Sequence, residues 1–132
     1  MKNKINLLKP IIFLFIFFFN MGLINAEEPF NFDVNDVEIL DEGNVFKGLN
    51  GGTVTTDEGL VIIADEFEYN KSLNILIATG NVNINDQIND YEIFAKKITY
   101  LKNIEKIFTI GDTKALIEKN YTFDSKNVEL FR

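Results

Sequence analysis

The chain has 132 residues, with 13 basic and 20 acidic side chains and no cysteine, histidine or tryptophan. The lack of cysteine excludes disulfides, thiolate metal sites and a lipid-modified N-terminal cysteine. The most frequent general base and the strongest nucleophile are missing, so we expect neither catalysis nor a metal or other cofactor. The acidic balance argues against nucleic acid as a partner, because nucleic acid binds basic surfaces.

Residues 1–26 have the pattern of a secretory signal peptide. Three lysines precede an unbroken apolar run over residues 11–19, and Ala26 stands immediately before an acidic pair. This order is typical of a cleaved signal. A retained membrane anchor is the alternative, but Asn20 interrupts the run, and a spanning helix needs about 20 apolar residues. Cleavage would leave 10 basic and 20 acidic residues, a net charge of -10.

Residues 27–132 are expected to form a single domain, because they contain no long polar linker. Alternation of apolar and polar residues with a period of two predominates, and Ile, Val, Phe, Tyr and Thr are enriched, which predicts an all-β fold. The predicted strands, in chain order, lie near residues 32–34, 37–39, 53–55, 60–64, 67–69, 73–78, 82–84, 91–100, 104–110, 114–117, 121–123 and 128–131. The glycines at 48, 51 and 52 predict a loop or tight bend.

An internal repeat runs through the middle of the chain. Its pattern, Ala-x-x-apolar-x-Tyr with a further apolar residue four places later, begins at Ala64 and again at Ala95. Gly80 and Gly111 follow the two copies at the same distance, and a weaker third copy begins near Ser125. Repeats of this length indicate stacked units that share one core. Each unit is predicted to be a β-hairpin.

The first copy of the repeat resembles the OstA-like family. Residues 63–70 read I-A-D-E-F-E-Y-N, and A-T-G-N-V follows at 78–82. These segments match the A-D-x-x-x-Y and A-T-G-N-V motifs of the family. The second copy departs from the pattern, since Lys96 replaces the aspartate and residues 109–113 replace the Gly-Asn-Val segment. The resemblance covers about residues 32–130 and implies an open, twisted β jelly roll built from repeated hairpins.

The family includes periplasmic bridge proteins of lipopolysaccharide transport and the N-terminal domain of the outer-membrane lipopolysaccharide-assembly protein. Residues 32–52, with G-N-V-F-K-G at 43–48, look closest to the latter. The resemblance implies a periplasmic, outer-membrane-associated domain that binds lipopolysaccharide acyl chains. It also implies pairing with like jelly rolls through edge strands, and outer-membrane assembly components as partners. A self-contained bridge protein, a fragment of a longer assembly protein, and a structural or adhesive domain without lipid all remain open.

The transport interpretation requires an apolar groove, because exposing an acyl chain to water costs about 0.8 kcal/mol per methylene. The candidate lining residues are apolar side chains of the repeat strands: Phe67, Tyr69, Ile75, Ile77, Val82, Ile84, Ile98 and Tyr100. Ordinary packing in a closed core is the competing interpretation for each of them. Since a domain at -10 should repel phosphorylated headgroups, recognition is expected to rest on the acyl chains.

Overall fold

The computed structural model describes residues 28–132, so the predicted signal peptide lies outside the described residues. They form one antiparallel ten-stranded sheet with two short 3-10 segments, η1 (Asp41–Gly43) and η2 (Lys102–Ile104). No helix in this part of the chain is long and apolar enough to cross a membrane. The strands are β1 (Phe30–Leu40), β2 (Val45–Thr56), β3 (Val61–Ala64), β4 (Glu66–Asn70), β5 (Ile75–Asp86), β6 (Tyr91–Leu101), β7 (Lys106–Ile110), β8 (Thr113–Ile117), β9 (Tyr121–Ser125) and β10 (Glu129–Phe131).

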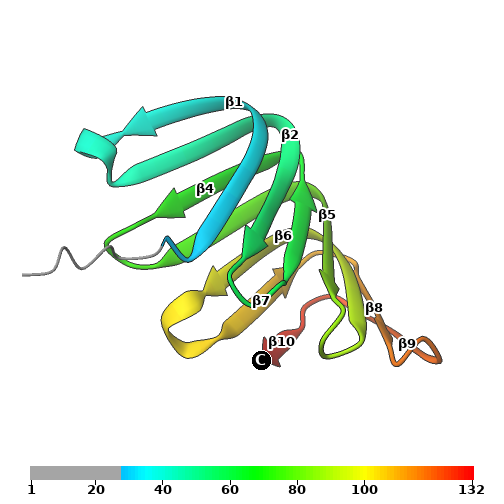
Figure 1. Cartoon of the computed structure of the whole chain (residues 1–132). Helices are drawn as coiled ribbons and strands as arrows, with labels where there is room; N and C mark the ends of the chain where they lie inside the picture. Colours follow the sequence, from blue (N-terminus) through cyan, green and yellow to red (C-terminus); the bar gives the residue numbers. More distant parts are fainter. Residues whose placement is uncertain (1–27) are drawn as a thin grey trace, which may run out of the picture.

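The long strands bend and divide their pairing between two layers (Figure 1). The start of β2 pairs with β4 and its end pairs with β3, and β5 divides its pairing between the same two strands. β6 pairs first with β8 and then with β7. The first layer contains β4, β7 and β10 with the adjoining halves of the long strands. The second layer contains β3, β8 and β9 with the other halves.

The glycine-rich segment of β2 is one of these bends, so of the two predicted alternatives the tight bend is found and the loop is not. β2 runs without a break from Val45 to Thr56. Gly51 has a φ of +81°, and a Cβ at Gly52 would lie 2.5 Å from the carbonyl oxygen of Asp33 on β1. Glycine therefore permits both the turn of the backbone and the close approach of the neighbouring strand.

The motif that carries the family resemblance forms the corresponding bend of β5. Gly80 has a φ of +80°, and its carbonyl accepts a hydrogen bond from the Asp65 backbone N–H at 2.9 Å. The Asn81 side-chain amide donates to the Asp65 carboxylate at 2.8 Å. A Cβ at position 80 would lie 2.9 Å from the Asp65 Cβ. Asp65, Gly80 and Asn81 thus hold the bend, whereas other residues of the two motifs, such as Tyr69 and Val82, face the interior.

The second copy builds the same bend with an ion pair. The Lys96 backbone N–H donates to the Gly111 carbonyl at 3.2 Å, and the Lys96 ammonium lies 2.5 Å from the Asp112 carboxylate. Lys96 thus occupies the place of Asp65, and Asp112 that of Asn81. This exchange explains how the second copy departs from the family pattern and still keeps the geometry of the bend.

The core lies between the inner faces of the two layers. In β5 the buried residues are Leu76 and Ala78 before the bend, and Val82 and Ile84 after it. The pairing of β5 with β6 shifts between Thr79 and Val82. β5 keeps its inward phase through the shift, whereas in β6 the phase changes, from the buried Ile93 and Ala95 to the buried Ile98 and Tyr100. Because of this irregularity, both halves of β6 present apolar side chains to the same interior as β5.

Candidate functional site

Six of the eight candidate groove residues meet in this interior. Each has at most 2% of its surface exposed: Phe67, Tyr69, Val82, Ile84, Ile98 and Tyr100. They belong to one continuous apolar cluster that joins both layers. Their side chains fill the middle of the space between the layers. Open apolar surface is therefore to be sought at the ends of the roll.

Ile75 and Ile77 are not part of this cluster, because they lie on the outer face of the first layer. Ile77 is paired with Glu68 on one side and Thr99 on the other, whereas the neighbouring Leu76 is completely buried. β5 is apolar on both faces in this stretch, so alternation could not decide which face points inward. In the structure β5 keeps one phase along its length, so Leu76 and Ala78 point inward with Val82 and Ile84.

An aromatic mouth opens at the β1–β2 end of the roll. The Phe30 and Tyr69 rings are 4.9 Å apart between centroids, and the Phe32 and Phe46 rings stack at 6.5 Å. The rings line a cavity of about 160 Å³ whose lining is Glu28, Phe30, Phe32, Phe46, Tyr69 and Lys71. Beyond it, Val37 and Ile39 alternate in phase with the core residues but are exposed. The apolar inner face therefore continues past the mouth and is exposed there within residues 28–132.

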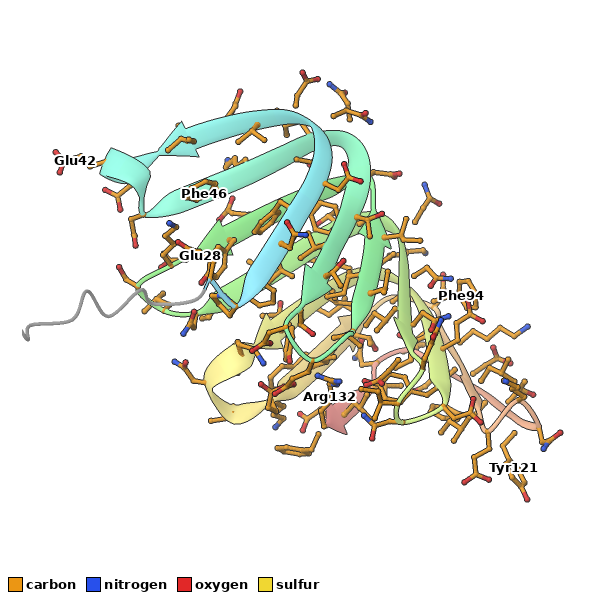
Figure 2. The ribbon with its side chains drawn as sticks, in the orientation of Figure 1. Glu28, Glu42, Phe46, Phe94, Tyr121 and Arg132 are labelled. Carbon is orange, nitrogen blue, oxygen red and sulfur yellow. The ribbon has the colours of Figure 1, made fainter. Side chains whose placement is uncertain are left out.

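The opposite end of the roll also leaves inner-face residues uncovered. Phe123 of β9 pairs with the buried Ala115, and Tyr121 pairs with Ile117, which packs against the core. Phe123 and Tyr121 share their face, yet both are exposed. Figure 2 shows Phe46 and Tyr121 at opposite ends of the molecule. The interior is thus apolar from end to end and uncovered at both ends.

Three cations mark the rim of the first layer at equivalent positions of successive repeats. Each directly follows the last residue of a strand, and its backbone N–H donates to a carbonyl of an earlier turn at 2.9–3.1 Å. The donor and acceptor pairs are Lys71 with Asn44, Lys102 with Asn74, and Arg132 with Glu105. The repeated backbone contact places the three side chains along one line.

Carboxylates from the rim of the second layer face these cations. Lys71 lies 2.7 Å from Glu28, Lys102 lies 3.4 Å from both Asp57 and Glu58, and Arg132 lies 2.7 Å from Asp86. These carboxylates precede β1, form the β2–β3 turn and end β5, respectively. We call these contacts the ion-pair row. It bridges the two layers along the side where they would otherwise part.

The Arg132 end of the row is buried. The side chains of Arg132 and Asp86 are 5% and 0% exposed, and Arg132 Nη1 also donates to Glu58 at 2.8 Å. Burial opposes ionisation of Asp86, but hydrogen bonds from Asn89 and the Arg132 guanidinium outweigh it and lower the pKa of Asp86 to about 2. This end of the row is a fixed closure.

Tyr100 and Lys102 lie next to the Arg132 end of the row, where both bond to Glu105. Burial and a hydrogen bond to Glu105 raise the pKa of the Tyr100 hydroxyl to about 12. Burial lowers the pKa of Lys102, but Glu105 at 2.6 Å more than offsets it, so the net shift is upward. Both shifts keep the groups in their usual protonation states.

The Lys71 end of the row is open. The side chains of Lys71 and Glu28 are 35% and 57% exposed. The Lys71 ammonium also lies 4.7 Å from the centroid of the Phe46 ring, at the border of the aromatic mouth. Burial, followed by the charge of Glu28, raises the pKa of Tyr69 inside the mouth. An apolar cavity and a single accessible cation therefore lie side by side.

The sequence candidates did not include the residues that form the mouth. Phe30 and Phe32 do show the alternation of an inward-facing strand, and Lys71 and Lys102 occupy the same place in the two repeats. These signals were present, but only the fold shows that β1 lies at the end of the stack. Within residues 28–132, no group of three or more His, Cys, Asp or Glu side chains is placed to hold a metal ion.

Comparison with known proteins identifies the fold. No family model matches the chain, and no curated protein is significantly similar to it in sequence. The crystal structure of LptH from Pseudomonas aeruginosa, the LptA-homologous periplasmic component of the conserved lipopolysaccharide transport device, is similar with a TM-score of 0.67. The sequence identity is 16%, over 77% of this chain and 75% of LptH. The β jelly roll expected from the OstA-like resemblance is confirmed.

Proposed function

We propose that this chain is a non-enzymatic, periplasmic domain of lipopolysaccharide transport that shields acyl chains between its two layers on the way to the outer membrane. The observation that carries the proposal is the apolar inner face, which is left uncovered at both ends of the roll. The similarity to LptH in fold supports it. The expected signal peptide at residues 1–26 agrees with export to the periplasm.

The physical basis is the replacement of water around an acyl chain. Each methylene that leaves water contributes about 0.8 kcal/mol, and such binding requires no reaction. The aromatic mouth supplies rings on both layers, and its cavity is already open. Passage farther inward requires the layers to move apart, because the six buried candidates occupy that space.

The free edges of the sheet favour like domains as partners. Within residues 28–132, β1 pairs with β2 alone, β9 pairs with β8 alone, and β10 contacts β7 over three residues. A strand of another jelly roll added at either edge would satisfy free backbone groups. It would also cover Val37 and Ile39, or Tyr121 and Phe123, and join two interiors. Outer-membrane assembly components are the partners we expect at the end of such a stack.

The test is photo-crosslinking to lipopolysaccharide from defined faces. A photoreactive residue at Phe46 or Phe123, on the uncovered inner face, should form a lipid adduct in the exported protein. The same residue at Ile77 or Phe94 is the matched control, because these apolar side chains lie on the outer face.

Adducts from the inner positions and their absence from the outer ones would support transport. Adducts from neither face would favour a structural or adhesive domain without lipid. Equal adducts from both faces would indicate nonspecific adsorption and contradict the proposed site.

A further inference from the structure

We infer that Lys71 binds the anionic headgroup of an amphiphile whose acyl chain enters the aromatic mouth, and that Glu28 is a resident anion which this headgroup displaces. The inference rests on the proposed function and adds to it a headgroup site on an acidic domain. It concerns one end of the ion-pair row, the contact between the segment before β1 and the β4–β5 turn.

The backbone holds Lys71 at the border of the mouth. Its N–H donates to the Asn44 carbonyl at 2.9 Å, and the next N–H, of Ser72, donates to the Asn44 side chain at 3.0 Å. These bonds fix the β4–β5 turn against the β1–β2 turn. The ammonium consequently stands over the Phe46 ring at 4.7 Å, with the cavity beside it.

Glu28 occupies the place that an anionic headgroup would take. Its carboxylate accepts a hydrogen bond from Lys71 at 2.7 Å and helps to line the same cavity. The carboxylate is exposed, and an ion pair of this kind contributes little to stability. A phosphate offers more charge and more acceptor oxygens than a carboxylate, and the acyl chain of the same molecule gains the aromatic surface. Displacement of Glu28 is therefore favourable for an amphiphile, although the domain as a whole is acidic.

Lys102 and Arg132 occupy equivalent positions but are unsuited to this exchange. Lys102 contacts three carboxylates and is 10% exposed, and Arg132 is 5% exposed against the buried Asp86. An incoming anion would have to break several contacts at once in a less polar setting. Within residues 28–132, Lys71 has one carboxylate partner, which is exposed, and it adjoins an open cavity.

The experiment compares two amphiphiles with the same alkyl chain, dodecyl phosphate and dodecyl maltoside, below their critical micelle concentrations. Calorimetric titration of the exported protein should show tighter binding of the phosphate. Glu28→Gln should strengthen phosphate binding by about threefold to fivefold, as expected for an exposed ion pair. Lys71→Met should remove the preference for the phosphate over the maltoside, and Lys71→Arg should retain it.

The matched control is the Lys47–Glu68 pair on the outer face, which has similar exposure and a separation of 3.4 Å. Lys47→Met and Glu68→Gln change the net charge equally and should leave the preference intact. A preference that survives in Lys71→Met, or is lost equally in Lys47→Met, overturns the inference.

Equal binding of the two amphiphiles by the wild type would overturn the headgroup site but leave the apolar site of the proposed function standing. Binding of neither would overturn both. Competition by inorganic phosphate as strong as that by dodecyl phosphate would also overturn it, because the site would then recognise a free anion.

Discussion

The two ends of the ion-pair row show how one repeat position can serve two purposes. Lys71–Glu28 and Arg132–Asp86 both bridge the layers at 2.7 Å, and both cations donate a backbone bond to an earlier turn. They differ in burial, since the first pair is exposed and the second is almost completely enclosed. Distance alone therefore does not reveal which pair can exchange its anion.

Solvent access gives the two pairs different energies. Water screens an exposed pair, whose net contribution is about 0–1 kcal/mol. In a buried pair, removing one partner leaves an uncompensated charge away from water, which destabilises the fold by about 3–5 kcal/mol. The comparison predicts a rigid closure at Arg132 and an adjustable one at Lys71.

The largest effect is expected from Asp86→Ala. The change leaves the buried Arg132 guanidinium with Glu58 at 2.8 Å and Glu105 at 3.6 Å, and it removes the acceptor of hydrogen bonds from the Ile88 and Asn89 backbone N–H groups. The free energy of unfolding should fall by about 3 kcal/mol, as measured by urea denaturation. A smaller loss of unfolding free energy than in Glu28→Gln would contradict the proposed difference between the two ends of the ion-pair row.

Low pH should remove most of the stability that Asp86 contributes to the folded chain. The pKa of Asp86 is lowered from 3.8 to about 2 in the folded state. On acidification the unfolded chain takes up the proton first, so the stabilisation is complete above about pH 4 and is lost as the pH falls through 2. The stability gap between wild type and Asp86→Ala should narrow by about 2 kcal/mol between pH 5 and pH 2. A gap independent of pH would exclude the ionised carboxylate as its cause.

Lys102→Met should have an intermediate effect. The side chain is 10% exposed, and its loss removes a 2.6 Å hydrogen bond to Glu105 and the contacts with the β2–β3 turn. We expect the free energy of unfolding to fall by about 1.5 kcal/mol, which is typical of the loss of a hydrogen bond to a charged group. The thermal unfolding temperature of this variant should lie between those of Asp86→Ala and Glu28→Gln. Any other order would show that burial does not determine how much each contact of the ion-pair row contributes to stability.

Glu28→Gln should change stability least, by less than about 0.5 kcal/mol, because water screens the pair. The same variant is the one expected to strengthen the binding of an anionic amphiphile. A large loss of stability in urea would show that Glu28 is a structural closure, and would remove the basis for its exchange.

The all-β fold, the strands and the repeat could be predicted because each depends on local alternation and spacing. The course of the strands through the bends could not be predicted. The glycines from Gly48 to Gly52 predicted a loop or a tight bend, but the sequence does not reveal that the strand continues through the bend with new partners on the other layer. The alternation also suggested a change of phase at Gly80, which placed Ile75 and Ile77 on the same face as Val82 and Ile84. β5 instead keeps its phase through the bend, so Ile75 and Ile77 face outward.

The inward-facing side chains in the middle of the roll could be predicted from the sequence, whereas the uncovered side chains at its two ends could not. Phe67, Tyr69, Val82, Ile84, Ile98 and Tyr100 face the interior because they belong to the repeat. Whether an inward residue is covered depends on its place in the stack, which joins residues far apart in sequence. Glu28 and Lys71, which are 43 positions apart, meet only in the folded chain.

The most direct test of acyl-chain binding between the layers is NMR with a fatty acid that carries a spin label on its chain. Paramagnetic broadening should be strongest for Phe32, Phe46 and Tyr69 at the aromatic mouth. It should be weak for Ile77 and Phe108 on the outer face, which are paired through Thr99. Broadening centred on that outer face, or none at saturating lipid, would contradict the account.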